Sequence, residues 1–250
     1  MDASLRAIEE LATDYLLQGE PALALAELSA VVDAAPDEGR LWELLGIGHW
    51  EIGQVRESIA ALETAMTLVP LGPEATLALG LGYEVIQKLP LAKDLFIDLA
   101  GSDALPLRVL EPLARGLGRA NESGLALAMC ERAASTQPDE LGPLMGMVFY
   151  MGRLGRPAEH LLPVLLRALG LAPEDFTIRM LAARCLHDCG LAEDAAELLR
   201  VADYLDSSCP SCLHAMQEIF LAAGDEPAAA DVVERLADVA RQAGDDQDCC

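Results

Sequence analysis

The chain has 250 residues, enough for one or two domains with a sizeable core, and carries a formal net charge of −24. So acidic a surface repels phosphate backbones and anionic lipid, which argues against nucleic-acid binding and against docking on a membrane, and favours partners that are basic or carry a basic stretch. Hydrophobic residues make up 52% of the chain but aromatic residues only 4%, and Ala and Leu dominate, which favours closely packed helices over sheets.

The amino-terminal residues read MDASLRAIEE and lack the basic stretch and apolar core of a secretory signal. The longest apolar stretches, such as 161–166, are too short to span a membrane. The seven cysteines are an odd number, and several fall at helical spacings expected to be buried, which suggests a reducing compartment rather than a disulfide framework. We therefore expect a soluble, cytoplasmic protein.

A repeat of 34 residues runs along the chain. Pro36, Pro70 and Pro138 are spaced by this length or by twice this length. A repeat frame begun at Leu5 explains most of the sequence. The successive repeats start at Leu5, Gly39, Pro73, Leu107, Leu141, Phe176 and Pro210.

Each repeat carries two apolar stripes at helical spacing. In the second repeat the first stripe, at places 4, 7, 8 and 11, is Trp42, Leu45, Gly46 and His49; the second, at places 20, 24 and 27, is Ser58, Leu62 and Ala65. The alternation of small and large residues predicts two helices that approach closely. A glycine at place 15, which tolerates a left-handed turn, ends the first helix in five repeats. These glycines are Gly19, Gly53, Gly155, Gly190 and Gly224.

The pattern resembles the tetratricopeptide repeat. The second repeat has the family residue at seven places and departs at one, where His49 replaces the usual Tyr. The matching residues are Trp42, Leu45, Gly46, Ser58, Leu62, Ala65 and Pro70. The resemblance implies an all-α protein, a right-handed α–α superhelix of about seven helical hairpins, with the first helices on the concave wall. We expect one solenoid over residues 1–250, ending near Arg241 and followed by an acidic tail, 242–250.

The middle of the chain departs from the repeat. Pro112 falls inside the first helix of the fourth repeat, and Pro163 inside the second helix of the fifth, where the frame also slips by one residue. A proline beside such a slip indicates a kink or a π-type bulge. Residues 107–170 are therefore either a drifted repeat without functional meaning, or a hinge or a widened groove that adapts to a ligand.

The resemblance also implies a binding site. Ligands of the family usually contact places 2, 5, 9, 12 and 13 of the first helices, which in this chain give apolar residues early and five arginines later. The predicted partner-binding residues are Ile47, Trp50, Leu77, Leu81, Val85, Arg108, Arg115, Arg119, Phe149, Arg153, Arg184 and His187. Arginine forks hold carboxylates, so the hypothesis is a peptide that is apolar at one end and acidic at the other. Alternatively, the arginines are a solvated face or pair with nearby acids, and Trp50 packs against the next repeat.

The cysteines suggest a metal site only at first sight. Cys209 and Cys212 have C-x-x-C spacing, and Cys185 and Cys189 lie one repeat earlier. In the repeat frame the second pair ends one helix and the first pair begins the next, so about 10 Å along the axis and about 9 Å between helices separate them. One metal cannot collect all four, and we expect no metal or cofactor. Cys209 and Cys212 alone could form a disulfide or bind a metal between subunits; Cys249 and Cys250 end the acidic tail.

Phosphate loops, nucleophile elbows and paired catalytic carboxylates are not found in the sequence, so we do not expect an enzyme. The leading hypothesis is an interaction or scaffold module that binds a protein or peptide in its concave groove. A self-assembling structural protein, a homo-oligomer formed through the solenoid ends, is the second hypothesis. A secretion-type chaperone that guards an apolar segment of a client is the third.

Overall fold

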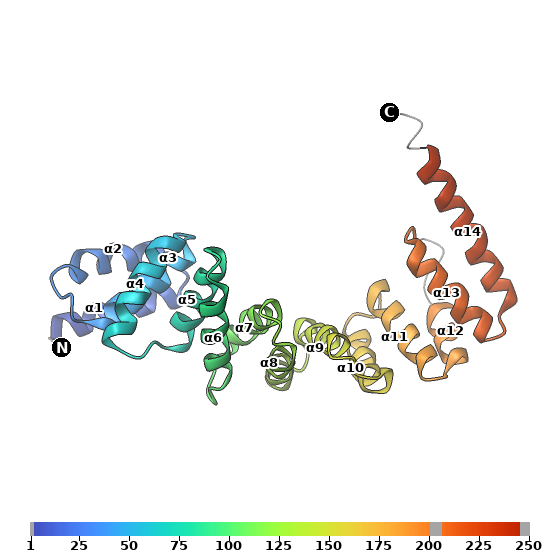
Figure 1. Cartoon of the computed structure of the whole chain (residues 1–250), viewed down its shortest axis with the longest axis horizontal. Coiled ribbons are helices and arrows are strands. Elements are labelled where there is room, and N and C mark those ends of the chain that lie inside the picture. The colour runs from blue at the N-terminus through green and yellow to red at the C-terminus, as the bar shows by residue number, and fades with distance from the viewer. Residues whose placement is uncertain (1–2, 201–206, 246–250) are drawn as a thin grey trace. The chain divides into compact units, whose positions relative to one another are not determined.

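The computed structural model describes residues 3–200 and 207–245, and within these ranges the chain is built from fourteen α-helices without a strand (Figure 1). Neighbouring helices along the chain pack in pairs, as the repeat predicted. Among the helices of these ranges, none has the length and apolar character needed to cross a membrane. The helices are α1 (Ala3–Leu17), α2 (Pro21–Val32), α3 (Gly39–Glu51), α4 (Val55–Leu68), α5 (Pro73–Val85), α6 (Leu89–Ala100), α7 (Leu107–Arg119), α8 (Ser123–Thr136), α9 (Leu141–Arg153), α10 (Ala158–Leu171), α11 (Phe176–Asp188), α12 (Ala192–Arg200), α13 (Pro210–Ala222) and α14 (Glu226–Asp245).

The repeat frame predicted where the helices begin. From the second repeat on, each first helix starts at the predicted residue: α3, α5, α7, α9, α11 and α13 begin at positions 39, 73, 107, 141, 176 and 210. Helix α1 begins at Ala3, two residues before Leu5, and α14 continues to Asp245, beyond the predicted end near Arg241. The last two cysteines, Cys249 and Cys250, lie outside the described residues.

A left-handed residue stands at place 15 of all seven repeats. Five of these residues are the predicted glycines, and the other two are Gln87 (φ 61°) and Asn121 (φ 65°). In every repeat the next N–H donates to the carbonyl five residues earlier, the Schellman arrangement that closes a helix end. The seven bonds are Glu20 to Tyr15, Gln54 to His49, Lys88 to Tyr83, Glu122 to Leu117, Arg156 to Met151, Leu191 to Leu186 and Asp225 to Phe220, at 2.8–3.0 Å.

The two helices of a hairpin approach each other at small residues. A Cβ added to Gly46 would lie 2.5 Å from Cγ of Leu62, and one added to Gly80 would lie 2.5 Å from Cε1 of Phe96. The hydroxyl of Ser58, which is buried, donates to the Gly46 carbonyl at 2.8 Å and so ties α4 to α3. Because no Cβ separates these helices, the large side chains fill the space between them.

The chain divides into two compact units, residues 1–136 (unit 1) and 137–250 (unit 2). Part of the core of unit 1 is a cluster around Leu28, Leu41 and Leu45; in unit 2 a cluster gathers around Leu199 and Phe220. The division falls within 107–170, but α7 and α10 remain α-helical through Pro112 and Pro163 without a π-type bulge in the described chain. One continuous solenoid, and a hinge at 107–170, stay predictions.

Replacing Gln87 with glycine is expected to stabilise unit 1 by about 0.5–1 kcal/mol. The left-handed conformation costs an ordinary residue roughly 1–2 kcal/mol, which glycine avoids, while the greater freedom of glycine in the unfolded chain offsets part of the gain. Urea unfolding followed by tryptophan fluorescence checks this, because both tryptophans, Trp42 and Trp50, lie in unit 1. Asn121→Gly is the matched control and should gain less, since Asn tolerates this conformation; a Gln87→Gly variant less stable than wild type would contradict the account.

Candidate functional site

The first helices of unit 1 line a hollow of about 870 Å³, which we call the inner groove. Helices α1, α3, α5 and α7 contact one another in succession, so their inward faces form one continuous wall. Thirteen-residue helices α3, α5 and α7 begin at equivalent places of the repeat, which brings equivalent residues side by side. The lining residues include Leu16, Leu17, Arg40, Glu43, Ile47, Trp50, Glu51, Glu74, Leu77, Leu81, Arg108 and Pro112.

The middle of the inner groove is apolar. Ile47 and Trp50 of α3 and Leu81 of α5 are half-buried, and Leu77 is 8% exposed. Leu17, at the end of α1, is 61% exposed on the same wall. An apolar surface of this kind, rimmed by charged residues, is typical of a site for an apolar side chain of a partner.

Glu43 is a buried carboxylate that joins α3 to the start of α5. It is 1% exposed; Oε1 accepts from the backbone N–H of Gly72 at 2.8 Å, and Oε2 accepts from Nη1 of Arg40 at 2.6 Å. Gly72 is the residue immediately before α5, so the carboxylate satisfies a donor at the start of that helix. Arg40 also lies 3.4 Å from Glu9 of α1, so Arg40 links α1 to α3 while Glu43 links α3 to the residue that precedes α5.

Glutamate–arginine pairs join successive first helices. Arg108 of α7 contacts Glu74 of α5, with Nη2 2.8 Å from Oε1. Arg119 donates from Nε and Nη2 to both carboxylate oxygens of Glu84, at 2.9 and 2.6 Å. The partners stand 34 residues apart in the first pair and 35 in the second, about one repeat. For Arg108 and Arg119 the structure therefore supports the alternative that they pair with acids of the neighbouring repeat.

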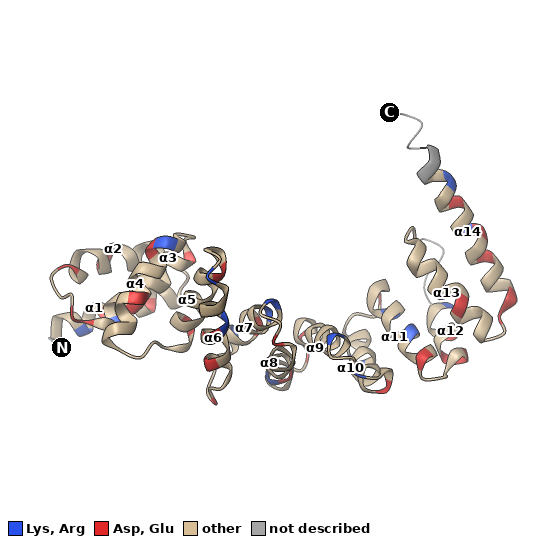
Figure 2. Cartoon of the chain, viewed as in Figure 1, with Lys and Arg blue, Asp and Glu red and all other residues tan. Residues whose placement is uncertain are grey.

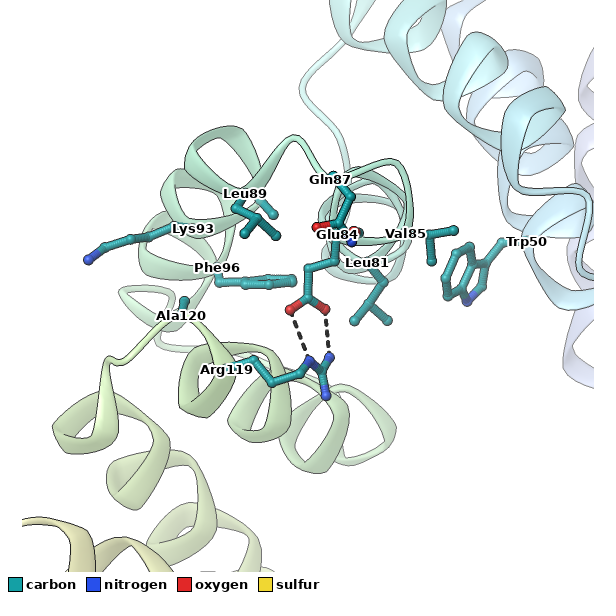
Figure 3. Close-up of a pocket in the computed structure, with 11 residues that line it drawn as sticks. Trp50, Leu81, Glu84, Val85, Gln87, Leu89, Lys93, Phe96, Arg119 and Ala120 are labelled. Carbon is teal, nitrogen blue, oxygen red and sulfur yellow. Dashed lines mark hydrogen bonds and ion pairs between the residues drawn. The ribbon is translucent and has the colours of Figure 1, made fainter.

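A second hollow of about 580 Å³ lies beside the inner groove and shares Trp50 and Leu81 with it. Figure 3 shows the Arg119–Glu84 pair along one side, with Trp50 facing Val85 and Phe96 projecting from α6. Val85 is 59% exposed here. The inner groove thus takes the first part of α5, from Pro73 to Leu81, and the second hollow takes its last part, from Leu81 to Val85.

The structure brings together seven of the twelve predicted residues around the two hollows of unit 1. They are Ile47, Trp50, Leu77, Leu81, Val85, Arg108 and Arg119. Arg115 lies on α7 but lines neither hollow; it is exposed and contacts Glu111 of its own helix at 3.3 Å.

The other four predicted residues belong to unit 2. Phe149 of α9 is 58% exposed and stacks edge-on against Tyr150, with ring centroids 5.0 Å apart. Arg153 is exposed on the same helix, and Arg184 is exposed on α11. His187 of α11 is half-buried, and its Nδ1 is buried without a hydrogen-bond partner in the described chain. Neither hollow of unit 1 includes these four residues.

Sequence reasoning missed several lining residues. Leu16 and Leu17 stand at places 12 and 13 of the first repeat, so extending the same rule to that repeat would have found them. Leu89 and Lys93 line the second hollow from α6, a second helix, which a rule restricted to first helices excludes. Pro112, which the sequence marked only as an irregularity, contributes to the wall of the inner groove.

Outside the two hollows, the acidic and cysteine side chains of the described residues form no metal-binding cluster. Acidic positions are spread over the helices of both units (Figure 2). Across 3–200 and 207–245, no three His, Cys, Asp or Glu side chains gather closely enough to hold a metal ion.

Comparison with known proteins identifies the fold. The chain is similar to solved structures of a mutant of MamA (24% identity, 68% of this chain and 99% of that one, TM-score 0.55) and of PilF from Pseudomonas aeruginosa (16%, 79% and 90%, 0.52). It is also similar to the C-terminal part of a TPR repeat-containing protein from Cytophaga hutchinsonii (13%, 92% and 95%, 0.63). No family model and no curated protein sequence matches the chain. The chain therefore has the tetratricopeptide-repeat fold, which confirms the predicted all-α class.

Glu43→Ala is expected to destabilise unit 1 by about 2 kcal/mol. The change removes a buried, charge-assisted hydrogen bond and leaves the Gly72 N–H without its acceptor. Glu43→Gln keeps one acceptor oxygen and should cost about half as much. Urea unfolding followed by tryptophan fluorescence measures both, with Glu57→Ala on the exposed face of the first turn of α4 as a control that should cost less than about 1 kcal/mol. Equal effects at Glu43 and Glu57 would refute the structural role.

Proposed function

We propose that unit 1 binds a partner polypeptide in the inner groove and acts as an interaction module rather than as a catalyst. The observation that carries the proposal is the hollow of about 870 Å³ on the wall formed by successive first helices, with Ile47, Trp50, Leu77 and Leu81 along its middle. An aromatic side chain among aliphatic ones, partly exposed in a concave wall, is the kind of residue that anchors protein interfaces.

The charges of the inner groove indicate what the partner carries. Arg40 and Arg108 already contact Glu43 and Glu74, so neither needs a carboxylate from a partner. Glu51 lines the same hollow, is exposed, and forms no ion pair with another described residue. Desolvation raises the pKa of Glu51, and Arg108 partly offsets that rise. Glu51 is thus the carboxylate of the inner groove that no ion pair occupies among the described residues, and it is the charge available for recognition.

The preferred ligand is therefore an amphipathic segment that is apolar on one face and carries a Lys or Arg. Its apolar side chains lie against Trp50 and Leu81, and its cation approaches Glu51. This proposal differs from the sequence-based hypothesis, which expected one end of the ligand to be acidic rather than basic. The formal net charge of −24 favours the same choice, because an acidic protein attracts basic segments over longer distances.

Trp50 offers a direct readout of occupancy. The chain has two tryptophans, and Trp42 is held by a hydrogen bond from its Nε1 to the Pro36 carbonyl at 2.9 Å. In a Trp42→Phe background, Trp50 is the single tryptophan and lies in the wall shared by both hollows. A change in its fluorescence on addition of a peptide then reports contact with the proposed site.

Peptides selected from a random library by the purified Trp42→Phe protein are expected to combine apolar residues at helical spacing with Lys or Arg, and to change Trp50 fluorescence on binding. Trp50→Ala should raise the Kd about 30-fold or more in a direct binding assay, as loss of an interface anchor does. Glu51→Lys should weaken basic peptides about tenfold or more and improve acidic ones.

The matched control is Glu57→Lys, which makes the same charge change on the exposed face of α4. It should leave the affinity within about twofold, because Glu57 lines neither hollow and an exposed charge outside the contact contributes little at physiological salt. Equal losses from Glu51→Lys and Glu57→Lys would refute recognition in the groove. Failure to select any peptide, together with a concentration-dependent rise in mass by light scattering, would instead support the self-assembling alternative.

A further inference from the structure

We infer that Cys209 and Cys212 form a redox-active dithiol at the start of α13, which a small disulfide such as glutathione disulfide oxidises reversibly to an intramolecular disulfide. This inference concerns unit 2 and is independent of the groove in unit 1.

The two thiols have the placement that a disulfide needs. Cys209 is the residue immediately before α13, Pro210 occupies the first helical position, and Cys212 follows in the first turn. The fixed φ of proline matches the helical value needed at that first position, so Pro210 restricts the backbone between the two cysteines. Helix geometry puts Cα atoms three residues apart at about 5 Å, inside the range of about 4.4–6.8 Å found in disulfides. Both thiols are free.

The two cysteines differ as an attacking and a resolving thiol differ. Cys209 is exposed, whereas Cys212 is half-buried and packs against the core cluster formed by α11, α12, α13 and α14. Cys209 forms no regular capping hydrogen bond with its side chain. Two groups of Cys212 nevertheless lower the pKa of the Cys209 thiol: first its backbone N–H, and second its own thiol. Burial raises the pKa of Cys212, and Arg184 partly offsets that rise. At neutral pH the exposed thiol is therefore the more easily ionised of the two.

The other cysteine pair described in unit 2 lies in surroundings that disfavour a thiolate, in contrast to those of Cys209. Cys185 and Cys189 lie at the opposite kind of helix end, the carboxyl end of α11, where the helix dipole disfavours a thiolate. Burial raises the pKa of Cys185, and desolvation with nearby Glu159 and Asp188 raises that of Cys189. Metal binding explains the Cys209–Cys212 pair less well, because no third potential ligand lies close to it among the described side chains.

The proposed reaction is thiol–disulfide exchange in two steps. The Cys209 thiolate attacks one sulfur of glutathione disulfide, the glutathione S–S bond breaks, and a mixed disulfide forms as one glutathione thiolate leaves. Cys212 then loses its proton, and its sulfur attacks the Cys209 sulfur, which releases the second glutathione. The two protons lost by the protein are taken up by the two glutathione thiolates. The net change oxidises two protein thiols and reduces one glutathione disulfide.

The test uses the full chain with Cys249→Ser and Cys250→Ser, treated with glutathione disulfide at neutral pH and digested with trypsin after blocking free thiols. Cleavage after arginine places Cys209 and Cys212 together in peptide 201–235, and Cys185 and Cys189 together in peptide 185–200. The expected result is that peptide 201–235 loses two hydrogens and regains them on treatment with reduced glutathione, while peptide 185–200 stays a dithiol. Iodoacetamide should also label Cys209 about fivefold or more faster than Cys189.

Single variants assign the two roles. Cys212→Ser is expected to trap one glutathione on Cys209, and Cys209→Ser to take up none under the same conditions. Equal oxidation of both peptides, no loss of hydrogen from peptide 201–235, or a first adduct on Cys212 would each overturn the inference. The measurement on the chain with Cys209 and Cys212 intact decides the matter even if a single variant fails to fold.

Discussion

The close approach of two helices at a residue without a side chain is the contact on which the rest of the structure depends. Gly46 receives the side chain of Leu62, and Gly80 and Gly116 receive opposite sides of the Phe96 ring. Phe96 therefore packs between α5 and α7 and fixes the spacing of successive first helices. Because one hairpin cannot bury its apolar face alone, the core forms only as neighbours stack. The inner groove is the surface left by that stacking.

Several charged residues of unit 1 form ion pairs between its helices, so they are not free to bind a ligand. Pairs such as Glu84 with Arg119 are partly exposed, so each adds only about 0–1 kcal/mol to stability. They neutralise the arginines that line the two hollows, and they connect α1 to α3 and α5 to α7. A partner consequently meets an apolar surface beside Glu51, which forms no ion pair with another described residue, rather than a row of unpaired arginines.

Most of the fold could be predicted from the sequence because the repeat fixes small and large residues at constant spacing. The frame that starts at Gly39 and Pro73 marks the helix starts, and Gly19 and Gly53 mark the turns. The same turn at Gln87 and Asn121 was hidden, since the surrounding hairpin imposes the left-handed conformation on residues that do not favour it.

The candidate site could be predicted only in part. Its apolar residues follow the place rule of the repeat, whereas the state of its arginines depends on contacts between helices that a single helix pattern does not contain. Arg108, for example, stands at a ligand-binding place but reaches back to Glu74 of the preceding repeat. The contribution of α6 to the second hollow depends likewise on how α6 packs beside α5.

The most direct test of the groove is site-specific photo-crosslinking in the native host. A benzoylphenylalanine at Leu17, which is 61% exposed in the inner groove, is compared with one at Met66, which is 48% exposed on α4 and lines neither hollow. The account predicts a crosslinked polypeptide from position 17, lost when Trp50 is replaced by Ala, and none from position 66. A crosslink from position 66 without one from position 17 would contradict it.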